Sequence, residues 1–148
     1  MKLVKDVLNE KGDDIWSIAP DALVFDAIEM MAQKEIGALP VLEAGNLIGI
    51  ISERDYTWKV ILKGKSSKET MVKTIMTSPV ICTDPDQDVK KCMGLMTSKN
   101  IRHLPVLEDD KLVGIVSLGD LVKTIIAEQE SKIRGLESYF LYRSDLTH

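Results

Sequence analysis

The sequence predicts an α/β (α+β) fold made of two similar units that are related by a pseudo-two-fold axis. The chain has 148 residues, of which 45% are hydrophobic and 28% are charged, which suits a globular protein with a substantial core. It contains an internal repeat, and each copy combines a helical apolar pattern with two short apolar runs. We therefore expect two sheets that pack on each other, with the helices outside.

The internal repeat has an offset of 65 residues. Residues 20–55 align with residues 85–120 without a gap, and 16 of the 36 aligned positions are identical. Unrelated segments of ordinary composition would share roughly two. Upstream of the aligned blocks, residues 4–8 resemble residues 72–76. A unit of about 65 residues would be marginally stable alone, so the two copies should pack together and any cleft should lie between them.

The same offset sets the expected organisation of the chain. It predicts a first repeat at 3–63, a linker at 64–71, a second repeat at 72–127 and a helical extension at 128–148.

Each repeat should contain a helix just after a proline. Asp21 and Asp86 follow Pro20 and Pro85 and are candidate N-caps. Beyond them, apolar residues recur at the spacing of one buried helical stripe. These are Val24, Ile28 and Met31 in the first copy and Val89, Met93 and Met96 in the second.

A β-hairpin should follow each of these helices. Two apolar runs, 38–43 and 47–51, are separated by the polar turn at 44–46, and the second copy turns at Asp109 and Asp110. The runs are nearly continuous in Val, Ile and Leu, which indicates that both sheet faces are covered. Further helices should run from Ser52 to about Leu62 and from Ser117 onward.

Composition excludes several classes of protein. The formal net charge is −4, whereas nucleic-acid binders usually present a basic face. No apolar run is long enough to span a bilayer, and we expect no membrane partner and no secretory signal. Two cysteines and two histidines predict neither a disulfide framework nor a metal site. No nucleophile stands with a base and an orienting group, so we do not expect an enzyme. We expect the protein to be cytoplasmic.

One motif occurs once in each repeat, where a strand meets a helix. It reads Gly-Ile-Ile-Ser-Glu-Arg-Asp at 49–55 and Gly-Ile-Val-Ser-Leu-Gly-Asp at 114–120, each time after a Leu-Pro-Val strand. This pattern resembles the CBS domain, named for cystathionine β-synthase, and the pair looks like a stand-alone Bateman module. The resemblance implies a β-α-β-β-α order in each repeat. It also implies clefts that bind AMP, ADP, ATP, NAD or S-adenosylmethionine, and assembly as a homodimer.

The motif residues have a chemistry that suits a nucleotide. An ionised carboxylate can accept hydrogen bonds from both hydroxyls of a ribose, so Asp55 and Asp120 are candidate ribose ligands. Ser52 and Ser117 stand at helix N-termini, where free N–H groups and the helix dipole favour a phosphate. A serine N-cap followed by an acid at the third helical position is also close to a capping box, which needs no ligand. The two roles can coexist.

The two copies differ just before Leu-Pro-Val. Arg102 and His103 stand in the second copy where the first has Gly37 and Ala38. A guanidinium can bind phosphate oxygens in a fork, and a histidine can add a donor whose charge depends on pH. In the CBS family such basic residues often pair with phosphates, and the alternative is a surface arginine beside a hydrogen-bonded histidine in the sheet. A close-set Arg-His pair suits a short phosphate chain, so AMP is favoured.

We therefore predict that the second-repeat site is the better nucleotide site. Its candidate residues are Thr83, Arg102, His103, Pro105, Ser117 and Asp120. The first-repeat site is predicted to be weaker, because it departs from the family pattern. Its candidates are Ile18, Ala38, Ser52, Arg54 and Asp55.

Two functions compete at this point. The first is a non-catalytic regulatory module that binds adenine nucleotide and signals to a partner protein, whose identity the sequence does not give. The alternative is an interaction or assembly scaffold with empty or vestigial clefts. The extension at 128–148 carries an apolar stripe with Tyr139, Phe140 and Tyr142, which favours self-association.

Overall fold

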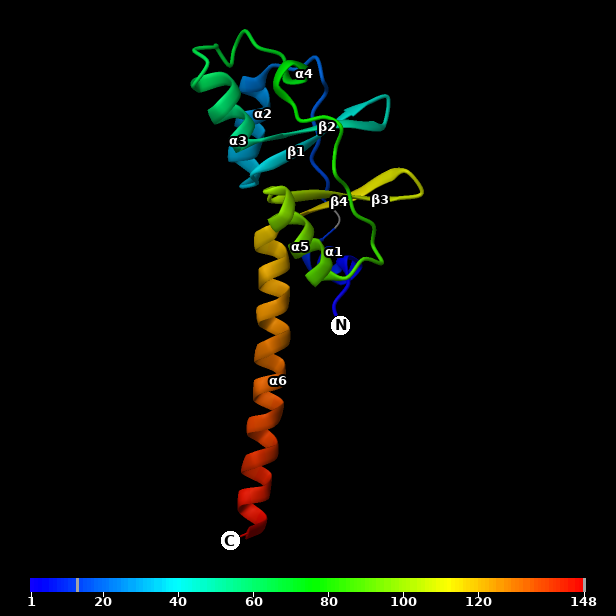
Figure 1. The fold of residues 1–148 in the computed structure, drawn as a ribbon, viewed down its shortest axis with the longest axis vertical. Coiled ribbons are helices and arrows are strands. Elements are labelled where there is room, and N and C mark those ends of the chain that lie inside the picture. The colour runs from blue at the N-terminus through cyan, green and yellow to red at the C-terminus, as the bar shows by residue number, and fades with distance from the viewer. Residues whose placement is uncertain (13, 148) are drawn as a thin grey trace.

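The structure is a computed structural model that describes residues 1–12 and 14–147, with side chains described up to residue 137. Its strands form two separate two-stranded antiparallel sheets, β1–β2 and β3–β4 (Figure 1). The strands are β1 (Ala38–Glu43), β2 (Asn46–Ser52), β3 (His103–Glu108) and β4 (Lys111–Ser117). The helices are α1 (Val4–Lys11), α2 (Val24–Lys34), α3 (Glu53–Tyr56), the π-helix η1 (Thr57–Ile61), α4 (Val72–Ile75), α5 (Val89–Lys99) and α6 (Leu118–Thr147).

The two repeats have matching sheets, which confirms the predicted α+β fold of tandem repeats. Val41 pairs with Gly49 in the first sheet and Val106 pairs with Gly114 in the second, and the register shifts just after each of these pairs. The hairpin turns also match the predicted positions, because the backbone has positive φ at 44–45 and at 109–110, as in the turns that suit the twist of a hairpin. Strands β2 and β4 lie in contact and join the two halves.

The first strand expected in each repeat is reduced to a single residue. Ile18 forms an isolated parallel bridge with Val41, and Thr83 forms the equivalent bridge with Val106. Each bridging residue donates its N–H to a proline carbonyl of the neighbouring strand, at 3.1 Å for Ile18 and 3.0 Å for Thr83. The expected strand is therefore present as an edge contact and not as a regular strand.

Helices α2 and α5 begin later than the proline-aspartate pairs indicate. The prediction that Asp21 and Asp86 are N-caps is wrong, since the caps are Leu23 and Asp88. Asp88 accepts a hydrogen bond from Lys90 N at 2.7 Å, whereas Asp86 donates its own N–H to the preceding turn. The Pro-Asp segments thus form turns that lead into the helices.

Each repeat is completed by the helix with which the other repeat begins. Helix α1 begins the first repeat, but Val4 and Val7 are buried in the core of the second repeat with Val89 and Leu104. In the same way, α4 supplies Val72 and Ile75 to the core of the first repeat. Backbone hydrogen bonds hold both exchanged segments, among them Val4 N to Gln87 O and Val72 N to Ala22 O. The two halves are therefore interlocked by packing as well as joined by the linker.

Two glycines allow these exchanged segments to approach the sheets. A Cβ on Gly114 would lie 2.6 Å from Cδ2 of Leu8 in α1, and a Cβ on Gly49 would clash with Met76, just after α4. Glycine late in a strand often marks such a close approach. The side chains of Met76 and Leu8 therefore fill the space beside these two glycines.

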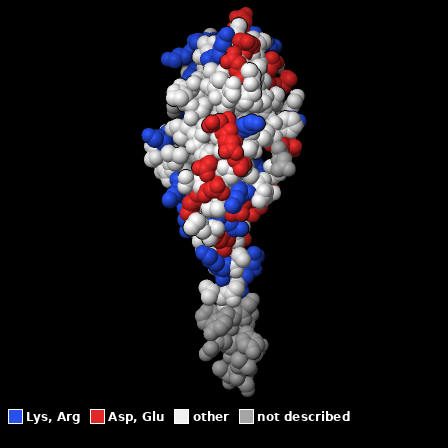
Figure 2. All heavy atoms as spheres, turned by 90° about the vertical axis from the view of Figure 1, so that its right-hand side faces the viewer, with Lys and Arg blue, Asp and Glu red and all other residues white. Residues whose placement is uncertain are grey.

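Acidic side chains gather along the face that carries the two hairpin turns (Figure 2). The hairpin ends hold the exposed residues Glu43, Glu108, Asp109 and Asp110. In the described part of the chain, no helix combines the length and the apolar character needed to cross a membrane.

Candidate functional site

A cleft of about 700 Å³ lies between the two repeats and is lined by equivalent residues of both. Ser52 and Ser117 face it from the ends of β2 and β4, where α3 and α6 begin. The remaining polar lining includes Glu53, Arg54, Asp55, Thr77, Arg102 and His103. The cleft therefore brings together the two helix N-termini and three basic side chains.

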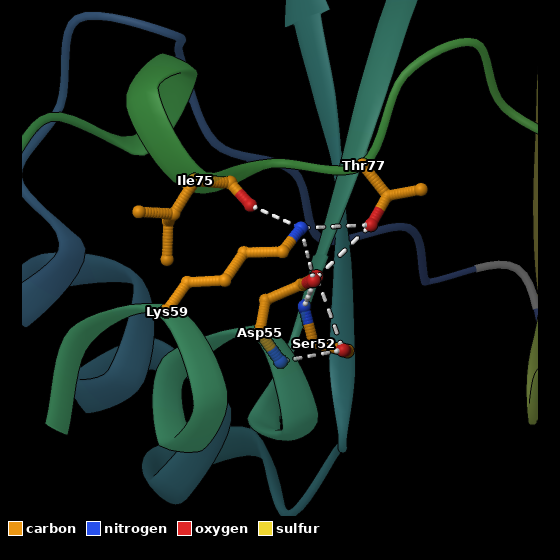
Figure 3. Close-up of polar contacts among 5 residues, drawn as sticks. All are labelled: Ser52, Asp55, Lys59, Ile75 and Thr77. Atoms are coloured by element: carbon orange, nitrogen blue, oxygen red, sulfur yellow. Dashed lines mark hydrogen bonds and ion pairs between the residues drawn. The ribbon is translucent and has the colours of Figure 1, made fainter. Parts of the chain in front are cut away.

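Asp55 is held by hydrogen bonds on both of its oxygens (Figure 3). Its Oδ2 accepts from Ser52 N at 2.9 Å and from Ser52 Oγ at 3.1 Å. Its Oδ1 accepts from Thr77 Oγ1 at 3.1 Å and pairs with Lys59 Nζ at 2.9 Å. The capping box is therefore fully formed, and a ribose could bind Asp55 only by displacing Thr77 or Lys59.

Asp120 has the same place in the second motif but fewer partners. Its Oδ2 accepts from Ser117 N at 2.9 Å and from Lys11 Nζ at 2.7 Å, while among the described residues Oδ1 accepts no hydrogen bond. Its side chain is 24% exposed, against 9% for Asp55. Asp120 is thus the more available carboxylate, although it stands beside the cleft wall and not among the residues that line it.

Lys11 stabilises the ionised form of Asp120. Burial raises the pKa of the Asp120 carboxyl, but the hydrogen bonds from Lys11 and from Ser117 outweigh this effect and lower the pKa below its ordinary value. Lys11 also donates to Ile115 O at 2.8 Å, so its ammonium spans the end of β4 and the start of α6. An exchanged helix therefore holds the ribose candidate of the second site.

His103 lies across the pseudo-two-fold from Gly37, the residue that aligns with its neighbour Arg102. A Cβ on Gly37 would lie 3.2 Å from His103 Nε2, so the missing side chain of the first copy makes room for the imidazole of the second. Burial, followed by the nearby charge of Lys11, lowers the pKa of His103 below its ordinary value. The neutral form of His103 is therefore favoured at pH 7.

Arg54 also reaches across the repeat boundary. Its Nη1 donates to Asn100 O at 2.7 Å, at the end of α5, and its guanidinium lies 5.2 Å from the centre of the Trp58 ring. Arg102, at the start of the other Leu-Pro-Val strand, is exposed. The cleft thus has one arginine anchored by contacts and one with an exposed side chain.

Four predicted site residues lie away from this cleft. Thr83 lines a separate pocket of about 500 Å³, where its Oγ1 is 3.3 Å from Cys92 Sγ. Pro105 is buried beside it and accepts the Thr83 N–H. Ile18 and Ala38 occupy the sheet of the first repeat, and neither lines the cleft. The structure brings together Ser52, Arg54, Asp55, Arg102, His103 and Ser117.

Three further residues around the cleft were missed by the sequence reasoning. Lys59 lies four residues after Asp55 on the same helical segment, so the i, i+4 rule could have found it. Thr77 reaches the site through an isolated bridge to Ile50, and Lys11 through the exchange of α1. No local pattern signals either of these two.

A scan against protein families matches the CBS domain twice, over residues 4–59 and 72–127. The chain therefore belongs to the family of CBS-domain proteins and carries a tandem CBS pair.

Similar proteins share this organisation. The CBS domain-containing protein CBSX3, mitochondrial, of Arabidopsis thaliana is 39% identical over 146 residues, which cover 92% of this chain and 70% of that protein. A solved protein with CBS domains from Burkholderia ambifaria MC40-6 is 45% identical, with a TM-score of 0.83, over 86% of this chain and 96% of that one. The CBS domain pair of MJ0100, solved with 5′-methylthioadenosine and S-adenosyl-L-methionine, is 27% identical, with a TM-score of 0.77, over 86% of this chain and 98% of that one.

Proposed function

We propose that this protein is a non-catalytic regulatory module that binds an adenine nucleotide, with AMP favoured over ADP, ATP and NAD, in the cleft between its CBS repeats. The observation that carries the proposal is the cleft itself. It has the volume of a small-molecule site and presents two helix N-termini and three basic side chains at one place. The adenosyl ligands bound to the CBS pair of MJ0100 support the same class of ligand.

The phosphate should bind where Ser117, Arg102 and His103 converge. Arg102 is exposed and can bind phosphate oxygens in a fork. The N-terminus of α6 adds the positive end of its helix dipole, although Leu118 N already donates to Arg102 O and Asp120 N donates to Ser117 Oγ. The ribose should bind the open Oδ1 of Asp120, because both oxygens of Asp55 already accept two partners. These contacts support the second-repeat site as the stronger one. Thr83 and Pro105 lie outside this cleft.

Isothermal titration of AMP into matched variants tests this assignment. We expect Asp120→Ala to weaken AMP binding about 10- to 100-fold, the loss that corresponds to a hydrogen bond with a charged group. Asp55→Ala should have a smaller effect, and Asp21→Ala, an exposed aspartate outside the cleft, should have none. Arg102→Ala provides a second variant that leaves both capping boxes intact. Loss of binding in Asp55→Ala with wild-type affinity in Asp120→Ala would reverse the order of the two sites.

The alternative function is an interaction or assembly scaffold whose cleft stays empty. A thermal-shift panel of AMP, ADP, ATP, NAD and S-adenosylmethionine separates the two functions. A ligand at 100 times its dissociation constant adds about 2.7 kcal/mol to the free energy of unfolding, which raises the melting temperature measurably. The scaffold predicts no shift with any of them. Product analysis after long incubation with ATP or NAD tests the non-catalytic role.

Signalling requires that the nucleotide favours one arrangement of the two repeats over another. Arg54 and Asn100 join the halves at the cleft, so a ligand there can change the geometry that the module offers to a regulated partner protein. A second copy of the chain is the other partner that we propose. The cytoplasmic location stays a prediction from the sequence.

A further inference from the structure

Helix α6 extends far beyond the body of the protein (Figure 1). Its first turns belong to the second core, where Leu121 is buried and Ile125 packs against the cluster. Further along, three large apolar side chains are exposed: Ile126 by 51%, Ile133 by 53% and Leu136 by 59%. This helix therefore carries apolar surface that the body of the same subunit does not cover.

These exposed residues lie along one stripe of the helix. Together with Gln129 they recur at alternating intervals of three and four residues, which is the heptad spacing of a coiled-coil seam. Ile126 and Ile133 take the a positions, and Gln129 and Leu136 take the d positions. We call these four residues the α6 seam. The apolar stripe predicted from the sequence continues to Tyr139, Phe140 and Tyr142. These residues lie outside the part of the chain whose side chains are described.

We propose that the α6 seam pairs with the seam of a second copy of this chain, in a parallel, in-register coiled coil of two helices. β-branched residues at a with leucine at d favour two parallel strands. In that register Gln129 faces Gln129 of the partner subunit, so each amide meets a hydrogen-bond partner within an otherwise apolar seam. The seam is thus complementary to itself.

The charges beside the seam favour the parallel direction. In a parallel pair, Lys132 at a g position lies beside Glu137 of the partner subunit at the following e position, and symmetry makes this pair twice. Within one subunit Lys132 pairs with the partly buried Glu128, at 3.5 Å, while its own side chain stays 63% exposed and can therefore reach a partner subunit.

The antiparallel alternative is less well matched in charge. Placing Ile126 opposite Leu136 of the partner subunit buries the same apolar residues. In this arrangement Lys132 lies beside Lys132 of the partner subunit, and Glu130 lies beside Glu130 of the partner subunit. One pair is favourable, because Lys123 lies beside Glu137 of the partner subunit. Like charges at these positions oppose association.

Light scattering and sedimentation of the full chain test the association. The wild-type chain of 16.5 kDa should be at least dimeric at micromolar concentration. Ile133→Asp should raise the dimer dissociation constant at least 100-fold, while Ser131→Asp, on the opposite face of the same helix, should leave it unchanged. Far-UV circular dichroism of both variants confirms that the body stays folded. A monomeric wild type, or equal masses for wild type and Ile133→Asp, would overturn the proposal.

A charge swap and a cross-link test the direction. Lys132→Glu should weaken the dimer, and the added change Glu137→Lys should restore it, because only the parallel pair places these residues together. In a Cys82→Ser background, Gln129→Cys should form an interchain disulfide under mild oxidation, and Ser131→Cys should not. Absence of both the rescue and the Gln129→Cys cross-link in a protein that still dimerises would show an antiparallel pair and refute the parallel one.

Discussion

At the scale of residues, the two aspartates of the repeated motif show how one sequence position can hold two different chemistries. Asp55 accepts hydrogen bonds from Ser52 at the end of β2 and from Thr77 after α4, and it pairs with Lys59 of η1, so its carboxylate serves structure. Asp120 lacks the equivalents of Thr77 and Lys59 and depends instead on Lys11. The motif alone predicts both as capping residues and as ribose ligands. Their neighbours decide which role is open to each.

His103 should make AMP binding depend on pH. Its pKa is lowered in the free protein, and a bound phosphate raises it, so binding takes up a proton. The affinity that His103 contributes therefore increases as the pH falls from the raised pKa of the bound state toward the lowered pKa of the free protein. Because the phosphate of AMP titrates near pH 6 as well, the measured quantity is the affinity ratio of wild type to His103→Gln between pH 8 and pH 5.5. A ratio that stays constant over this range would exclude His103 from the phosphate site.

Lys11→Met should reduce stability at neutral pH and not in acid. The lowered pKa of Asp120 contributes stability above the pKa of the unfolded chain, and this contribution is lost as the pH falls through the folded value. Since the pair is partly exposed, we expect a loss of about 0.5–1 kcal/mol at pH 7 in urea unfolding. The difference between variant and wild type should vanish near pH 2. Lys5→Met, which removes an exposed pair with Asp86, is the control and should change little.

At the scale of elements, the sequence predicts the features that depend on neighbouring residues, and it does not predict the exchange of helices between the two repeats. The hairpins and the serine caps at Ser52 and Ser117 follow from turn chemistry and apolar runs, and the structure contains them. The exchange of α1 and α4 was not predicted, because both repeats offer the same apolar surface and the pattern does not say which copy a helix joins. The pairing of Lys11 with Asp120, far apart in the chain, depends on that exchange.

The glycine of each motif should be required by packing. Gly114→Ala should lower the free energy of unfolding by about 1–3 kcal/mol, because its Cβ would press on Leu8 and displace α1. The control is Gly94→Ala in the middle of α5, where a Cβ meets open space. Alanine suits a helix better than glycine, so this control should gain up to about 1 kcal/mol. Urea denaturation followed by circular dichroism measures both, and a Gly114→Ala protein as stable as wild type would contradict the packing at this position.

At the scale of the whole molecule, the exchange of segments should make the two repeats unfold together. Neither core is complete without residues that belong to the other half of the chain, since Val7 lies in the second core and Ile75 in the first. Loss of either core therefore releases a segment that crosses the molecule and weakens both. This coupling also connects the cleft to both cores, because Lys11 and Thr77 reach it from the exchanged segments.

The two tryptophans allow this coupling to be measured. Trp16 and Trp58 are the chain's only tryptophans and lie in the first repeat, so fluorescence reports that half while circular dichroism reports both. Val7→Ala removes packing from the second core and should cost about 2 kcal/mol. If the halves are coupled, the urea midpoint of the fluorescence change falls together with that of the dichroism, at one fixed protein concentration. An unchanged fluorescence midpoint together with a lowered dichroism midpoint would show that the repeats unfold independently. A nucleotide bound between them would then have no rigid coupling through which to act.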